Sequence, residues 1–166
     1  MRVDPITELF FEVFVEKMRF LENEWRLVRR EDKSEYMFAD LIYFDEENDN
    51  AIIFYFELRD NIVILYMQNR KTRRPDVFPP EAFPEAWRDI SDPLLDLSLR
   101  LPFRKEYREF FNKSRLKFFN ELQDRAIMQR DLEAARASLE IQAEFYVYLL
   151  RKYQQDILSI IKGKIR

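Results

Sequence analysis

The sequence predicts an α+β fold in which helices from both ends of the chain cover an antiparallel sheet. Three observations carry this prediction. A helical amphipathic period opens the chain, short runs of aromatic and β-branched residues follow, and residues 103–162 contain neither proline nor glycine. The simplest interpretation of the 166 residues is a single domain, which is long enough to bury a substantial core.

The first helix is predicted over residues 5–23. Asp4 and Pro5 are typical of a helix start, with an N-cap followed by proline at the first helical position. Apolar residues then recur every three or four positions, and glutamates occupy the other side, so the helix should bury one face. The apolar stripe consists of Ile6, Phe10, Phe14, Met18, Leu21 and Trp25.

Three or four antiparallel strands are predicted next, over residues 25–31, 34–44, 51–58 and 62–68. Their connections are short, including an acidic turn at residues 45–50, and short connections make neighbouring strands antiparallel. On the strand 51–58 the side chains alternate between two faces, and we expect the more apolar set to pack on the helix. That set is Ile52, Phe54, Phe56 and Leu58; the opposite set is Ile53, Tyr55 and Glu57.

The remaining chain divides into a proline-rich loop, residues 70–102, and a helical hairpin, residues 103–166. The six prolines of this loop exclude a regular helix or central strand, although a short helix is expected over residues 93–100. One straight helix over residues 103–162 would be roughly 90 Å long, so we expect a break near residues 123–130. The predicted seam of the last helix is Leu132, Ala135, Leu139, Ala143, Tyr146, Leu150, Tyr153, Ile157 and Ile160.

The composition excludes several kinds of chemistry. The chain has no histidine, no cysteine and one glycine, Gly163. It therefore lacks the residues of Ser-His-Asp and Cys-His triads, of zinc sites and of glycine-rich phosphate loops. Carboxylate–metal, lysine or tyrosine chemistry remains, or no chemistry at all. We expect a non-catalytic protein with no cofactor and no metal.

Charge and hydropathy also restrict the partners and the cellular location that we expect for the protein. The net charge of −3 and the pI of about 5.3 are not typical of a nucleic-acid-binding domain. Residues 1–20 lack the pattern of a signal peptide, and no uncharged run is long enough to span a bilayer. We expect a cytoplasmic protein that does not interact with membranes. The sequence leaves the oligomeric state open.

The acidic hairpin region is the predicted partner-binding surface. Residues 40–60 contain seven acids and one base, and tyrosines lie in the same strands. An acidic patch attracts a basic protein, and tyrosine is a frequent interface residue. The predicted contact residues are Tyr36, Tyr43, Asp45, Glu46, Glu47, Asp49, Tyr55 and Glu57.

Two alternatives remain open. The basic residues Arg70, Lys71, Arg73 and Arg74, with aromatic neighbours, could track a nucleic-acid backbone. In addition, Asp40 or Asp45 followed by Glu57-Leu58-Arg59 resembles the restriction-endonuclease-like nucleases, which hold Mg²⁺ with an aspartate and a Glu-x-Lys motif; Arg59 stands where those enzymes have lysine. The alternation of acids in the turn also resembles a calcium loop, but the glycine and distal glutamate of that loop are missing.

A further resemblance concerns the two ends of the chain. Phe20-Leu21-Glu22, residues 51–60 (AIIFYFELRD) and residues 148–158 (YLLRKYQQDIL) are similar to small bacterial proteins with a leading helix, a meander and a closing helix. Some of those proteins are regarded as immunity-like partners of secreted toxins. The resemblance covers about the first seventy residues and the last twenty. It implies a protein that binds and neutralises another protein.

Overall fold

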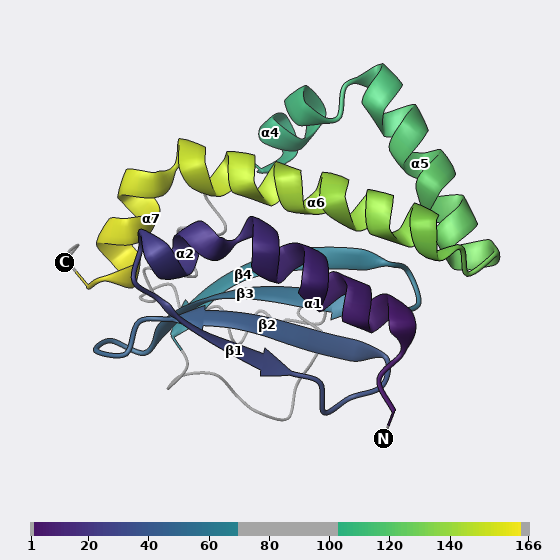
Figure 1. Ribbon diagram of the computed structural model, residues 1–166. Helices are drawn as coiled ribbons and strands as arrows, with labels where there is room; N and C mark the ends of the chain where they lie inside the picture. The colour runs from purple at the N-terminus through teal and green to yellow at the C-terminus, as the bar shows by residue number, and fades with distance from the viewer. Residues whose placement is uncertain (1, 70–102, 164–166) are drawn as a thin grey trace, which may run out of the picture.

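The computed structural model describes residues 2–69 and 103–163 (Figure 1). The elements within them are α1 (Pro5–Lys17), α2 (Arg19–Asn23), β1 (Val28–Asp32), β2 (Phe38–Phe44), β3 (Asn50–Glu57), β4 (Ile62–Asn69), α4 (Phe103–Phe110), α5 (Lys113–Met128), α6 (Leu132–Lys152) and α7 (Gln154–Ile161). This arrangement confirms the predicted α+β class. The predicted proline-rich loop, the short helix over residues 93–100 and the side chain of Ile160 lie outside the described part.

The sheet is an antiparallel meander of four strands in the order β1-β2-β3-β4. Two strand boundaries differ from the prediction by more than one residue. The first strand begins at Val28 instead of residue 25, because Trp25 is buried in the core and Arg26 has a φ of 59°, which interrupts an extended backbone. The second strand begins at Phe38, four residues later than predicted, after the bend that joins it to β1.

One face of the sheet packs on helices, as predicted from the alternation along β3. Ile52, Phe54, Phe56 and Leu58 all belong to the main hydrophobic core. The ring of Phe10 stacks on Phe56 at 4.8 Å between centroids, and Phe14 lies 5.3 Å from Phe54. Ile53 is on the opposite face, in a separate buried cluster with Ile42 and Ala51. Both faces of β3 are therefore buried.

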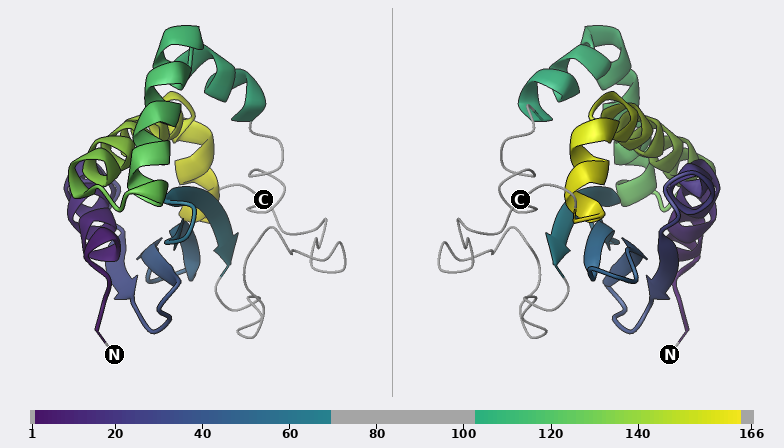
Figure 2. Two further views of the ribbon diagram at one scale, coloured as in Figure 1. Left: turned by 90° about the vertical axis from the view of Figure 1, so that its right-hand side faces the viewer. Right: turned by 90° about the vertical axis from the view of Figure 1, so that its left-hand side faces the viewer.

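Helix α6 runs parallel to α1 along the covered face of the sheet. Ion pairs between the two segments occur in the same order along both: Asp4–Arg130, Glu12–Arg136, Lys17–Glu144 and Glu24–Arg151. Surface pairs of this kind contribute little each, but their order defines the relative direction of the helices. Helix α5 packs on the other side of α6, so that the helices form two layers over the sheet (Figure 2).

The predicted break between the last two long helices is confirmed at residues 129–131, between α5 and α6. The predicted helix over residues 5–23 is interrupted at Met18. Two more interruptions, at residues 111–112 and at Tyr153, lie in the stretch without proline or glycine, where the sequence predicted one break only. Most of the predicted seam of the last helix, which runs through α6 into α7, is buried. Leu132 is an exception, because it is 49% exposed at the first position of the helix, before α6 reaches the core.

The interior rings give a prediction for stability. Phe54 is fully buried between α1 and α6, so Phe54→Ala should lower the free energy of unfolding by about 3–5 kcal/mol. Phe118→Ala removes the same kind of ring from an exposed position and should change the free energy of unfolding by less than about 0.5 kcal/mol. Urea unfolding followed by circular dichroism measures both. Equal losses in the two variants would contradict this assignment of the core.

Candidate functional site

The acidic turn, residues 45–50, is built around the carboxylate of Asp45. Its Oδ2 accepts hydrogen bonds from the backbone N–H of Asn48 at 3.0 Å and from Asn48 Nδ2 at 2.7 Å. Its Oδ1 accepts from Nζ of Lys162 at 2.9 Å. Both carboxylate oxygens of Asp45 therefore have partners within the chain, and this residue holds the shape of the turn.

The end of α7 lies against the same turn. Asn50 Nδ2 donates to the carbonyl oxygen of Ile161 at 3.1 Å. Gly163 has a φ of 70°, and a Cβ atom at this position would lie 2.9 Å from Asn48 Oδ1. The single glycine of the chain is thus found where a left-handed backbone passes close to the turn. These contacts, with the Asp45–Lys162 ion pair, form what we call the α7 latch.

The acids of the turn have different electrostatic environments: Asp45 is buried, whereas Glu46 and Glu47 are exposed. Burial alone would raise the pKa of Asp45, but the hydrogen bonds from Lys162 and Asn48 outweigh it and hold the pKa below its usual value. Asp45 is consequently ionised, and its carboxylate is bonded to Lys162 and Asn48. Glu46 and Glu47 are exposed, and neither forms an ion pair within residues 2–69 and 103–163. The carboxylates of these two residues are the ones that the turn presents to solvent.

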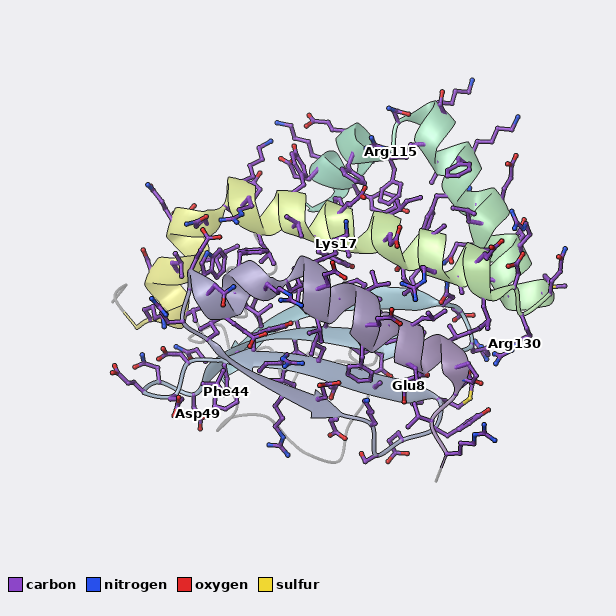
Figure 3. The ribbon with its side chains drawn as sticks, viewed as in Figure 1. Glu8, Lys17, Phe44, Asp49, Arg115 and Arg130 are labelled. Atoms are coloured by element: carbon purple, nitrogen blue, oxygen red, sulfur yellow. The ribbon has the colours of Figure 1, made fainter. Side chains whose placement is uncertain are left out.

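The other predicted contact residues do not share one surface. Tyr43 is fully buried in the helix-covered core, and Tyr55 is buried on the opposite face of the sheet. Glu57 is half-buried, and Asp49 is partly exposed with a φ of 60°. Tyr36 is 49% exposed, but it lies before β2, whereas the acidic turn lies after it. Figure 3 shows Asp49 at one end of the molecule and Arg130, which lies near Tyr36, at the other.

An apolar surface occupies the end where Tyr36 lies. Asp4 Oδ2 accepts from the Tyr36 hydroxyl at 3.4 Å and from Arg130 at 2.6 Å, so the β1–β2 and α5–α6 connections meet there. Large exposed hydrophobic side chains neighbour these contacts along the chain. We call Tyr36, Met37, Ile127, Met128 and Leu132 the apolar end.

The residues of the nuclease alternative are widely spaced. Glu57 pairs with Phe38 at the start of β2, whereas Asp45 follows the end of that strand, so the length of β2 separates them, about 23 Å. Asp40 is closer to Glu57, on the same face, but it is buried at 7% exposure and pairs with Tyr55. No group of three carboxylates close enough to hold a metal ion occurs in the described residues. The basic residues Arg70, Lys71, Arg73 and Arg74 lie outside them.

A second charged surface lies at the junction of α4 and α5. Five exposed cations occur there, and we call them the basic elbow: Lys105, Arg108, Lys113, Arg115 and Lys117. This surface was not predicted, because the prediction for residues 103–162 rested on their helical character alone. Residues 103–118 contain six bases and two acids, so a count of charge by segment would have found it.

The elbow is fixed to α6 by a buried carboxylate. Glu106 is 1% exposed, and it accepts hydrogen bonds from Lys152 at 2.9 Å and from the hydroxyls of Tyr148 and Tyr153 at 2.8 Å each. The hydrogen bond from Lys152 is the largest cause that lowers the pKa of Glu106 to about 2, with the two tyrosines adding to it against desolvation. Because Lys152 neutralises Glu106, that acid does not offset the charge of the elbow.

Comparisons of the chain with protein-family models, with curated proteins and with solved structures found no match. Among the helices of the described residues, none combines the length and the apolar character needed to cross a membrane.

The Glu106 site gives a prediction for pH dependence. Because its pKa is lowered in the folded state, Glu106 contributes stability above the pKa of an unfolded glutamate, about 4.3, and loses it as the pH falls towards 2. Glu106→Gln should therefore unfold at lower urea than the original chain at pH 7, with the gap narrowing below about pH 4. The exposed neighbour Glu109 is the control, and Glu109→Gln should have little effect. A gap that is constant from pH 7 to pH 3 would contradict the assignment.

Proposed function

We propose that this protein is a non-catalytic binding module of immunity type, which binds and neutralises a basic protein through the acidic turn. The observation that carries the proposal is the pair of exposed carboxylates, Glu46 and Glu47, on a turn whose backbone is held from within by Asp45. A carboxylate without an internal cation is available to a cation on another molecule.

The rigidity of the turn supports binding. An ordered loop loses less conformational entropy on association than a flexible one, so a preformed turn gains affinity for a complementary surface. The α7 latch provides that order through Lys162 and Ile161, which come from a distant part of the chain. In this proposal Asp45 positions the turn, and Glu46 and Glu47, with the partly exposed Asp49, make the contact.

The tyrosines have different roles in this proposal. Tyr43 and Tyr55 are buried and act in the core. Tyr36 belongs to the apolar end, so a partner that contacted both Tyr36 and the acidic turn would have to span β2. The acidic turn alone therefore defines the proposed contact for a basic partner, and the apolar end is a separate exposed surface.

Capture from a native lysate tests this proposal. The original chain should retain a basic protein in stoichiometric amount, and retention should fall with added salt because exposed charge pairs are screened. Glu46→Gln together with Glu47→Gln should lower the retained amount at least about 5-fold, as expected for the loss of about 1 kcal/mol or more of interfacial charge pairing. Mass spectrometry of the retained fraction measures the effect.

A matched control removes two acids elsewhere. Glu16 and Glu133 are exposed and form no ion pair in the described part of the chain, so Glu16→Gln with Glu133→Gln has the same charge but an intact turn. Equal loss in both double variants would show that net charge, not the turn, is responsible. Divalent-metal-dependent nuclease activity that Asp45→Ala or Glu57→Ala abolishes would overturn the non-catalytic proposal.

A further inference from the structure

The basic elbow is a concentrated positive surface on a chain of net charge −3. Within residues 2–69 and 103–163, none of its five cations forms an ion pair with a carboxylate. Of the two acids in residues 103–118, Glu106 is buried and neutralised by Lys152, which leaves Glu109 as the exposed one. The local field is therefore positive, although the chain as a whole is acidic.

The helix geometry places several of these cations together. Lys113 and Lys117 are one turn apart on α5, about 6 Å along its axis, and point to the same side. The first turn of α5 contains no acid, so the positive end of the helix dipole adds to the field of these side chains. Lys105 and Arg108 lie one turn apart on α4, on the other side of the junction.

Aromatic surface accompanies the charge. Phe118 follows Lys117 and is 54% exposed, whereas every other phenylalanine side chain that the structure describes is buried or partly buried. The guanidinium of Arg115 lies over the ring of Phe110 at 4.4 Å and donates to the Phe110 carbonyl at 2.7 Å, so this exposed planar group is held in place. Figure 3 shows Arg115 at the α4–α5 junction. Exposed rings and fixed guanidinium planes are surfaces on which nucleobases stack.

The position of the elbow also separates it from the acidic surface. The junction of α4 and α5 lies on the side of α6 away from the sheet, and the acidic turn lies at an end of the sheet (Figures 1 and 2). A polyanion can therefore approach the elbow without passing Glu46 and Glu47. The repulsion between that polyanion and the rest of the chain would restrict it to this side.

We propose that the basic elbow binds single-stranded nucleic acid, with Lys105, Arg108, Lys113 and Lys117 contacting phosphates and Phe118 stacking on a base. The proposal goes beyond the proposed protein-binding function and uses a different surface. It also differs from the alternative based on residues 70–74. An anionic membrane is disfavoured as the partner, because Phe118 is the sole exposed large hydrophobic among the described side chains of α4 and of the first two turns of α5.

Fluorescence anisotropy with labelled oligonucleotides of about 15 nucleotides, oligo-U and oligo-dT, tests the proposal, since this length covers a typical single-strand site. The original chain should bind at about 50 mM salt and weaken steeply by about 200 mM. Lys113→Gln with Lys117→Gln should reduce the slope of log K against log salt by about 1.4, or about 0.7 for each lost phosphate contact. Phe118→Ala should weaken binding at least about 5-fold, as expected for one lost stacking contact.

The control variant replaces two exposed arginines that lie outside the basic elbow. Arg19 and Arg30 lie in α2 and β1, and Arg19→Gln with Arg30→Gln should leave the affinity and the salt slope unchanged within about 2-fold. No oligonucleotide binding by the original chain at low salt would overturn the proposal. So would equal loss in both double variants, or binding to phosphatidylserine vesicles in the absence of oligonucleotide binding.

Discussion

The burial of Tyr146 joins the layers of this protein. Its ring lies 6.4 Å from Phe14 of α1 and 5.8 Å from Phe54 of β3, and its hydroxyl donates to the carbonyl oxygen of Val63 in β4 at 2.6 Å. A buried hydroxyl must have a partner, so this contact aligns α6 with the sheet as well as packing it there. Burial accordingly raises the pKa of Tyr146. Helices α1, α5 and α7 each contact α6, so the position of α6 also determines theirs.

The strands, the first helix and the α5–α6 break could be predicted because each rests on a local signal. Alternation along β3 separated Phe54 from Ile53 correctly, and Asp4 caps α1 by accepting from the N–H of Ile6 at 2.8 Å. Contacts between distant residues gave no such signal. Gln123 and Gln142 both donate to the carbonyl of Asn61 in the β3–β4 turn, and nothing in their local sequence marks them.

The candidate site was predictable only in part for the same reason. Composition identified the acidic turn, but it could not show that Lys162 engages Asp45 or that Tyr43 points into the core. A count of charge by segment would identify the basic elbow. Only the structure shows that Glu106 is hydrogen-bonded to Lys152 and so does not offset the charge of that surface. A small net charge therefore conceals two surfaces of opposite sign, and each is held in place by an ion pair with a buried carboxylate.

The α7 latch closes a very long loop. Lys162 reaches Asp45 across 117 positions of sequence, and Ile161 reaches Asn50 across 111. Contacts at such separation carry a large closure entropy, and they form after local hairpins and helices have appeared. During synthesis the hairpin of β2 and β3 would emerge long before the residues that latch its tip. The latched shape of that tip would thus form late in folding, and fraying of α7 would release it first.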